Sequence, residues 1–201
     1  MIKDFILKHF NFKVYSVTWI AFAVALSIIP ALMYMPQRWG WENGIIENIQ
    51  MVILWLIIGF CLTAKKHQRF FKLAALITTI IVIREVNCGR TLFFHVPGTE
   101  NSYYPWREIK YGYLAHPIYG AYIAIVALIA LKNQFFQELW DMAKSIKFPF
   151  WNILLASFAM FMGAIAEKAT NNNFIFEEGF ELLFYVSLFG IVYLYSRHKD
   201  F

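Results

Sequence analysis

The segment Ile80-Ile81-Val82-Ile83-Arg84-Glu85-Val86-Asn87-Cys88 decides how this chain folds, because an apolar run meets two charged residues in it. The apolar run before the charges covers only residues 73–83. A helix of that length rises about 16 Å, which is roughly half of a ~30 Å hydrocarbon core. We therefore expect the helix to continue and to carry Arg84 and Glu85 into the outer part of a membrane. Ionisable groups at that depth rarely face lipid, so their partners should come from other helices.

The composition of the whole chain indicates a membrane protein. It has 201 residues, of which 60% are hydrophobic and 15% charged, whereas soluble domains carry about 25% charged residues. The apolar runs are continuous, unlike the alternating segments of about 10 residues in a transmembrane β-barrel. The predicted fold is all-α: one polytopic helical bundle formed by residues 1–201. The first run, 14–35, is too long for a signal-peptide core, so we expect a retained first span.

The apolar runs predict six transmembrane helices and their orientation. Their approximate ranges are 14–35, 43–64, 70–88, 115–132, 150–168 and 178–196. If both termini are cytoplasmic, about twice as many Lys and Arg residues lie inside as outside. This predicts an N-in/C-in multi-pass protein of the cell inner (cytoplasmic) membrane. The net charge of +5 then reflects membrane topology, and nucleic acid is not an expected partner.

Two of the connecting segments are more than turns. Residues 89–114 form the longest outer segment, and their aromatic residues suit the headgroup region, so we expect a cap over the outer end of the bundle. Residues 133–148 place Phe135, Phe136, Leu139 and Trp140 at helical spacing opposite polar residues. This pattern predicts a short helix at the inner membrane interface.

With this topology, most polar residues of the spans come to the outer end. Asn43, Glu47 and Gln50 share one face of the second span. Glu178, Glu181 and Tyr185 are spaced to meet on the sixth span. Arg84 and Glu85 end the third span, His116 opens the fourth and Glu167 closes the fifth. Five spans therefore contribute a carboxylate or a histidine at a similar depth.

The excess of carboxylates predicts a bound cation or exchangeable protons. One arginine cannot neutralise five glutamates in a medium of low dielectric constant. A divalent metal ion is the cofactor that such ligands would take, although this chain lacks the Glu-x-x-His motif of di-iron bundles. The candidate metal ligands are Glu47, Glu85, Glu167, Glu178, Glu181 and His116. The candidate catalytic residues are Glu47, Arg84, Glu85, His116 and Glu181, and the candidate substrate-binding residues are Gln50, Arg90, Arg107 and Tyr185.

The dipeptide Arg84-Glu85 carries a more specific expectation. Neighbouring residues point about 100° apart on a helix, so we expect that Arg84 and Glu85 cannot pair with each other. Arg84 should instead balance carboxylates of the second, fifth and sixth spans, and its removal should cost more than the loss of any one glutamate. The alternative is a purely structural ion pair between helices, with the other acids solvated near helix starts.

Three functions remain open on the sequence alone. The first is a metal- or cation-dependent membrane enzyme that acts on a lipid headgroup or a small amphiphile at the outer (periplasmic) face. The second is a membrane sensor or accessory subunit, which docks a cytoplasmic protein at the basic inner loops. The third is a small-solute transporter or channel, which would need a homo-oligomer. Membrane lipids are expected partners in each case. The chain contains no G-x-S-x-G, H-E-x-x-H or P-loop motif.

Overall fold

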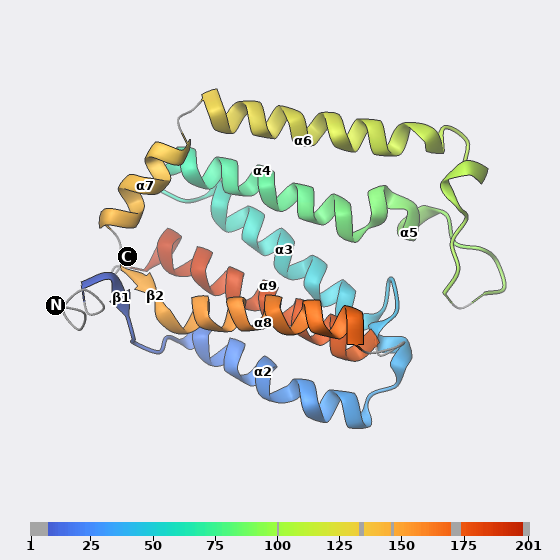
Figure 1. The fold of residues 1–201 in the computed structure, drawn as a ribbon, viewed down its shortest axis with the longest axis horizontal. Helices are drawn as coiled ribbons and strands as arrows, with labels where there is room; N and C mark the ends of the chain where they lie inside the picture. Colours follow the sequence, from blue (N-terminus) through green and yellow to red (C-terminus); the bar gives the residue numbers. More distant parts are fainter. Residues whose placement is uncertain (1–7, 100, 133–134, 146, 170–173, 199–201) are drawn as a thin grey trace.

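The protein is a bundle of long helices that run alongside one another (Figure 1). The structure is a computed structural model that describes residues 8–99, 101–132, 135–145, 147–169 and 174–198. Among these described residues, the six long helices are α2 (Ser16–Tyr34), α3 (Ile45–Leu62), α4 (Gln68–Glu85), α6 (Ala115–Lys132), α8 (Phe150–Ala169) and α9 (Phe174–Arg197). Two short strands, β1 (Phe10–Asn11) and β2 (Phe148–Pro149), pair in parallel. The predicted all-α fold is confirmed.

Within the residues that the structure describes, five segments are long and apolar enough to cross a membrane. They are Ser16–Tyr34, Gln37–Leu62, Gly112–Lys132, Phe150–Lys168 and Phe174–Arg197. The remaining long helix, α4, has 18 residues, but its two ends carry Arg69, Lys72, Arg84 and Glu85. The structure thus supports a multi-pass membrane protein, whereas the predicted number of six spans goes beyond what the helices establish.

The helix ends differ from the predicted span boundaries where the backbone turns into the left-handed region. The second span was expected from residue 43, but Asn43 has a φ of 64° and α3 begins at Ile45. The third was expected to reach residue 88, but α4 ends at Glu85, and Asn87 and Cys88 have φ values of 45° and 51°. Arg84 and Glu85 therefore occupy the last turn of α4.

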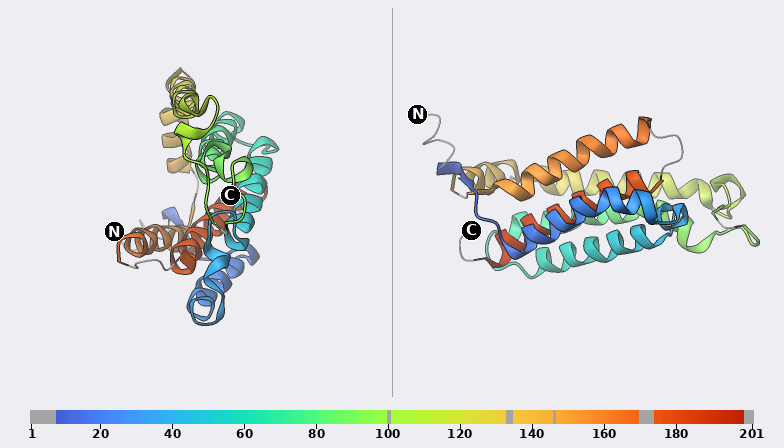
Figure 2. Two further views of the ribbon diagram at one scale, coloured as in Figure 1. Left: turned by 90° about the vertical axis from the view of Figure 1, so that its right-hand side faces the viewer. Right: turned by 90° about the horizontal axis from the view of Figure 1, so that it is seen from below.

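Helix α9 is the centre of the bundle and packs against α2, α3 and α8. Helix α4 packs on α3, and α6 packs on α4. Seen end-on, α4 with α6 and α8 with α2 form two arms joined through α3 and α9 (Figure 2, left). Close packing on α9 depends on small residues: an ideal Cβ on Gly190 would lie 2.2 Å from Nδ2 of Asn152 in α8.

The outer surfaces of the arms are apolar and exposed. Trp19 and Leu26 on α2 are 63% and 78% exposed, and Leu128 on α6 is 65% exposed. Many large apolar side chains exposed in this way are unfavourable in water. They suit contact with lipid, which agrees with the five segments that are long and apolar enough to span a membrane.

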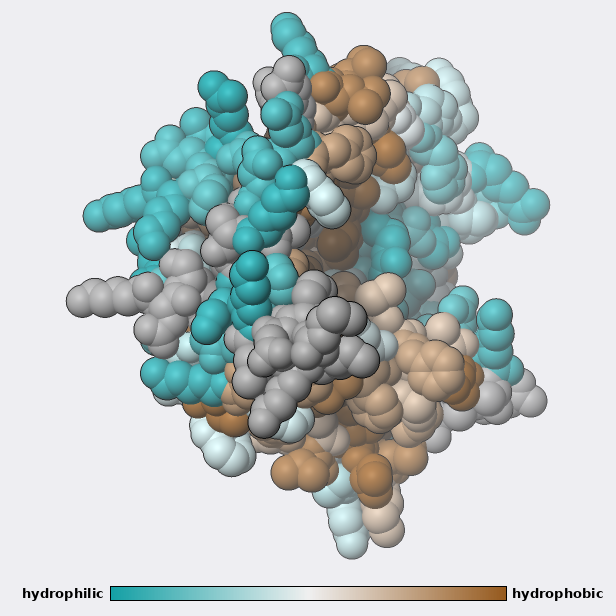
Figure 3. All heavy atoms as spheres, turned by 60° about the vertical axis from the view of Figure 1, so that its left-hand side comes forward, coloured by the Kyte–Doolittle hydropathy of each residue, from teal (hydrophilic) through white to brown (hydrophobic). Residues whose placement is uncertain are grey.

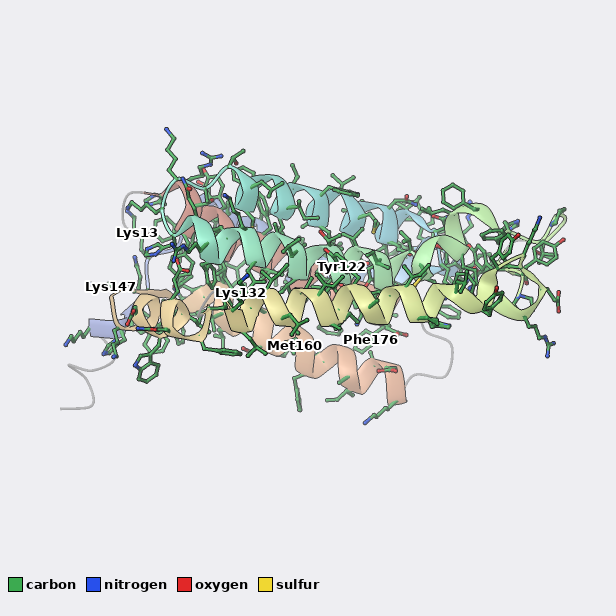
Figure 4. The ribbon with its side chains drawn as sticks, turned by 90° about the horizontal axis from the view of Figure 1, so that it is seen from above. Lys13, Tyr122, Lys132, Lys147, Met160 and Phe176 are labelled. Carbon is green, nitrogen blue, oxygen red and sulfur yellow. The ribbon has the colours of Figure 1, made fainter. Side chains whose placement is uncertain are left out.

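The two ends of the bundle differ in character. The end that holds the first and last described residues also holds helix α7 (Phe135–Ser145), with Lys13, Lys132 and Lys147 around it (Figures 1 and 4). We call it the basic end. A short helix in the 133–148 segment was predicted and is present. Phe135 of α7 stacks on Phe70 of α4 with ring centroids 5.5 Å apart, while Trp140 is 62% exposed.

The opposite end, which we call the acidic end, carries the segment that was expected to form a cap. It contains a 3-10 turn (Asn87–Gly89), the one-turn helix α5 (Arg90–Phe93) and two further 3-10 turns, Trp106–Glu108 and Gly112–Leu114. The backbone oxygen of Thr91 accepts a hydrogen bond from Asn43 Nδ2 at 3.0 Å. The Tyr103 hydroxyl donates to the backbone oxygen of Glu42 at 3.1 Å. These bonds attach the segment to the connection between α2 and α3.

Candidate functional site

Six polar side chains from three helices gather at the acidic end. We call them the carboxylate cluster: Glu47 and Gln50 of α3, Glu85 of α4, and Glu178, Glu181 and Tyr185 of α9. Gln50 is fully buried, and Glu47 and Tyr185 are 7% and 3% exposed. These helices meet because α3 packs against both α4 and α9. The sequence correctly predicted that these residues would converge.

Gln50 links α3 to α9 through a single amide. Its Nε2 donates to the backbone oxygen of Glu178 at 3.0 Å and to Glu178 Oε2 at 2.8 Å. Its own Oε1 is buried and makes no hydrogen bond to the described residues. Because buried polar atoms are nearly always satisfied, the unpaired Oε1 marks a place where a donor from a protonated carboxyl group or from a ligand would fit.

Tyr185 and Arg84 both bind Glu85. The Tyr185 hydroxyl donates to Glu85 Oε1 at 2.8 Å, and Arg84 Nη2 lies 2.7 Å from the same oxygen. Arg84 also reaches Glu181 at 3.8 Å. The expectation that Arg84 and Glu85 cannot pair was wrong, because both long side chains bend along the last turn of α4 and close the 100° between their directions.

The arginine is also less deeply placed than predicted. The Arg84 side chain is 62% exposed, whereas that of Glu85 is 9% exposed. An exposed guanidinium offsets little of the repulsion among buried carboxylates. Glu85 lies close enough to Glu47, Glu178 and Glu181 to repel each of them electrostatically. The cluster thus retains an excess of negative charge if its carboxyl groups are ionised.

Glu47 has a structural role of its own. It stands three residues after Gly44, the residue that caps the start of α3, and accepts a hydrogen bond from the backbone N–H of Asn43. A carboxylate at this position satisfies a free backbone donor and interacts favourably with the helix dipole. Glu47 therefore stabilises the start of α3, which makes it a weaker candidate for catalysis than Glu85 or Glu181.

A cavity of about 280 Å³ opens beside the cluster, and we call it the polar cavity. Its charged lining, among the described residues, consists of Arg84 and the three carboxylates Glu167, Glu177 and Glu181. Phe180, Phe184 and Tyr185 add aromatic surface. A pocket with carboxylates and aromatic rings suits an organic cation, because the ring faces and the acids both attract positive charge.

A second cavity, of about 420 Å³, lies under the segment 89–114, and we call it the loop cavity. Arg90 lines it and comes within 4.0 Å of Glu42, while its guanidinium lies 5.9 Å from the centre of the Tyr103 ring. Burial and the nearby Glu42 carboxylate raise the pKa of Tyr103 above its ordinary value. Glu177 lines both cavities and Glu178 lines the loop cavity.

Two predicted site residues, His116 and Arg107, reach neither the carboxylate cluster nor the polar and loop cavities. His116 is exposed at the start of α6, on the far side of α4 from α9 (Figure 1), and its ring packs edge-on against Trp106 at 5.7 Å. Arg107 is 84% exposed and pairs with its neighbour Glu108 at 3.7 Å. The segment 89–114 extends beyond α4 and α6 and carries Arg107 away from α9. His116 lies in α6, which packs on α4 and therefore holds it away from α9.

The predicted metal ion gains no support. Within the part of the chain that the structure describes, no three His, Cys, Asp or Glu side chains are grouped so that they could hold a metal ion. Because His116 lies away from the carboxylate cluster, the predicted nitrogen ligand is missing from it. Glu167 lies at the cavity wall and not in the hydrogen-bonded cluster.

Sequence reasoning missed the contributions of Glu42, Glu177 and Tyr103, which line the loop cavity. All three lie in or next to loops, where hydrophobic periodicity carries no information on contacts. The one available signal was the i, i+4 spacing between Glu177 and Glu181, which places both on one face of α9.

Comparison with known proteins gives no assignment: no family model, no curated protein and no solved structure matches this chain.

Proposed function

We propose that this is an inner-membrane protein, with both termini cytoplasmic, whose polar cavity binds the cationic group of a lipid headgroup or small amphiphile at the periplasmic face. The observation that carries the proposal is the excess of carboxylates over arginine at the acidic end. Glu167, Glu177 and Glu181 line the polar cavity with only Arg84 opposite them among the described residues. Arg84 is already bound to Glu85.

The distribution of basic residues supports the orientation. Lys13, Lys132 and Lys147 lie at the basic end (Figure 4), and the connection between α3 and α4 adds Lys65 and Lys66. Positive residues favour the cytoplasmic side. The carboxylate cluster would then face the periplasm, where a soluble or lipid-borne cation can reach it without crossing the membrane.

An organic cation fits better than a metal ion. The cavity combines carboxylates with aromatic rings, and its residues do not form a compact ligand set. If a reaction follows binding, the Tyr185–Glu85 pair, joined at 2.8 Å, is the group best placed to donate or accept a proton.

The proposal is tested by ligand-dependent stabilisation in a neutral detergent. Hexylamine should raise the unfolding temperature of the purified protein in a saturable way, whereas hexanol should not, since only the amine carries a positive charge. Saturating ligand at about 100 times its Kd adds about 2.7 kcal/mol of stability. Glu181→Gln should weaken this effect.

The matched control is Glu108→Gln, because Glu108 is exposed and pairs with Arg107 away from the cavity. This variant should respond to hexylamine as the wild type does. Equal stabilisation by hexanol and hexylamine, or an undiminished response in Glu181→Gln, would overturn the proposal.

A further inference from the structure

A third cavity, of about 270 Å³, lies between the arms on the side of the basic end, and we call it the apolar cavity. Its walls come from α3, α4, α7, β2 and α9 and are almost wholly hydrocarbon, including Ala74, Ile77, Leu188 and Val192. Seen obliquely from the basic end, the surface is hollowed between an upper lobe, where hydrophobic side chains lie beside hydrophilic ones, and a lower lobe that is mostly hydrophobic (Figure 3). A cavity of this composition suits an acyl chain.

The apolar and polar cavities lie along one seam. Ile81 of α4 lines both of them. On α9 the polar cavity takes residues 177–185, and the apolar cavity continues with residues 188–195. Helices α4 and α9 each pack on α3, and Ile57 of α3 lines the apolar cavity, so α3 forms the floor of the seam there.

The length of this seam matches a lipid. The fourteen residue steps from Glu181 to Tyr195 correspond to about 21 Å of helix rise. One leaflet contributes about 15 Å of hydrocarbon. A lipid chain whose headgroup lies at Glu181 and Arg84 therefore fits into the apolar cavity before the seam ends.

The charges around the polar cavity indicate which lipid headgroup would bind there. Arg84 binds Glu85 through Nε and Nη2, but a guanidinium carries five N–H donors and this side chain is 62% exposed. Guanidinium groups bind phosphate well. Glu167, Glu177 and Glu181 lie around the same cavity and complement an ammonium group. A phosphate and an ammonium a few bonds apart are the two charges of a zwitterionic aminophospholipid head.

We propose that the seam between α4 and α9 binds one aminophospholipid from the periplasmic leaflet, with its phosphate at Arg84, its ammonium among the carboxylates and one acyl chain in the apolar cavity. The proposal rests on the proposed function, because it identifies the amphiphile that the polar cavity takes. It adds the headgroup and the path of the chain.

The test uses two photoactivatable phospholipids that differ only in the headgroup. Both carry a diazirine halfway along one acyl chain; one head ends in an amine and the other in glycerol. The full-length protein is reconstituted in bilayers with each probe, illuminated and digested, and crosslinked peptides are quantified by mass spectrometry. We expect at least fivefold more crosslinking to residues 70–81 and 188–195 with the amine head than with the glycerol head.

Two variants distinguish lipid bound in the seam from lipid that merely contacts the protein surface. Ala74→Phe fills the apolar cavity and should reduce crosslinking in these ranges by at least threefold. Leu128→Phe, on the exposed face of α6, should leave it unchanged. If Ala74→Phe fails to fold, the comparison of the two headgroups in wild-type protein still decides the question.

The outcomes distinguish this inference from the proposed function. Equal crosslinking by both probes, or crosslinks confined to exposed faces such as that of α6, would overturn the lipid inference. If hexylamine still stabilises the protein in a Glu181-dependent way, the cation-binding function stands. Amine-selective crosslinking in the seam that Ala74→Phe abolishes would establish the inference.

Discussion

Replacement of Tyr185 by Phe removes one hydroxyl group from the carboxylate cluster and leaves the aromatic ring in place. That hydroxyl donates to Glu85 Oε1 at 2.8 Å, and both side chains are nearly buried, at 3% and 9% exposed. Hydrogen bonds to a charged partner are worth about 1.5–3 kcal/mol. Because each kcal/mol shifts the unfolding temperature of a protein of this size by about 2–4 °C, we expect a decrease of about 3–12 °C.

Helix α6 provides a matched control for this change. The Tyr122 hydroxyl donates to the backbone oxygen of Leu76 in α4 at 3.3 Å, so Tyr122→Phe removes the same atom from a bond with a neutral acceptor. Hydrogen bonds between membrane helices average about 0.6 kcal/mol. Tyr122→Phe should therefore lower the unfolding temperature by no more than about 2 °C.

The assay is thermal unfolding of both variants in the same detergent, followed by a double-mutant cycle with Glu85→Gln. In the cycle, the coupling between Tyr185 and Glu85 should exceed about 1 kcal/mol. If Tyr185→Phe lowers the unfolding temperature no more than Tyr122→Phe does, or if the coupling is near zero, the Tyr185 hydroxyl does not stabilise Glu85 and the description of the cluster is wrong.

Further predictions concern packing, charge and pH. Gly190→Ala places a methyl group against Asn152, where an ideal Cβ lies 2.2 Å from Nδ2, and should destabilise the protein by about 1–3 kcal/mol. In the same unfolding assay, Gly120→Ala on α6, which has open space around it, should be neutral or stabilising. Thr18→Val removes the 2.7 Å bond from the Thr18 hydroxyl to Asn152 Oδ1 and should cost about 1–3 kcal/mol. The comparison is Thr63→Val, at an exposed hydroxyl, which should cost less. Arg84→Met should change stability by less than about 1 kcal/mol, because the side chain is 62% exposed, yet should weaken retention of phospholipid during purification. The pKa of Tyr103 is raised in the folded protein. Its contribution to stability is therefore fully present below the ordinary tyrosine pKa of about 10 and is lost as the pH rises through the higher pKa of the folded state. Ultraviolet titration of the wild type and of Tyr103→Phe should differ by one phenol that ionises above the ordinary tyrosine pKa.

The sequence predicted the helices and the convergence of polar residues because both depend on periodicity. Apolar runs of helical length placed the six long helices within a few residues, and i, i+3 and i, i+4 spacing placed Glu178, Glu181 and Tyr185 on one face of α9. The topology then required the polar ends of α3, α4 and α9 to lie at the same end of the bundle (Figure 1).

The errors arose where the outcome depended on side-chain conformation or on loops. The direction of Cβ atoms was used to exclude an Arg84–Glu85 pair, but two long side chains close that separation and meet at 2.7 Å. His116 was assigned to the cluster on depth alone, whereas its position around the bundle is set by the packing of α6 on α4. Neither rotamers nor the lateral order of helices can be read from hydrophobic periodicity.

The stacking of Phe135 on Phe70 affects which bilayer leaflet can exchange lipid with the seam. This contact, with ring centroids 5.5 Å apart, ties α7 to α4 at the basic end. The bond from the Tyr195 hydroxyl to the backbone oxygen of Lys147 ties α9 to the residue before β2 at the same end. A lipid in the seam would then exchange with one leaflet and not with the other. In the proposed binding mode, occupancy would follow the lipid composition of the leaflet at the acidic end alone, so the protein would respond to a difference between the two leaflets without dissipating it.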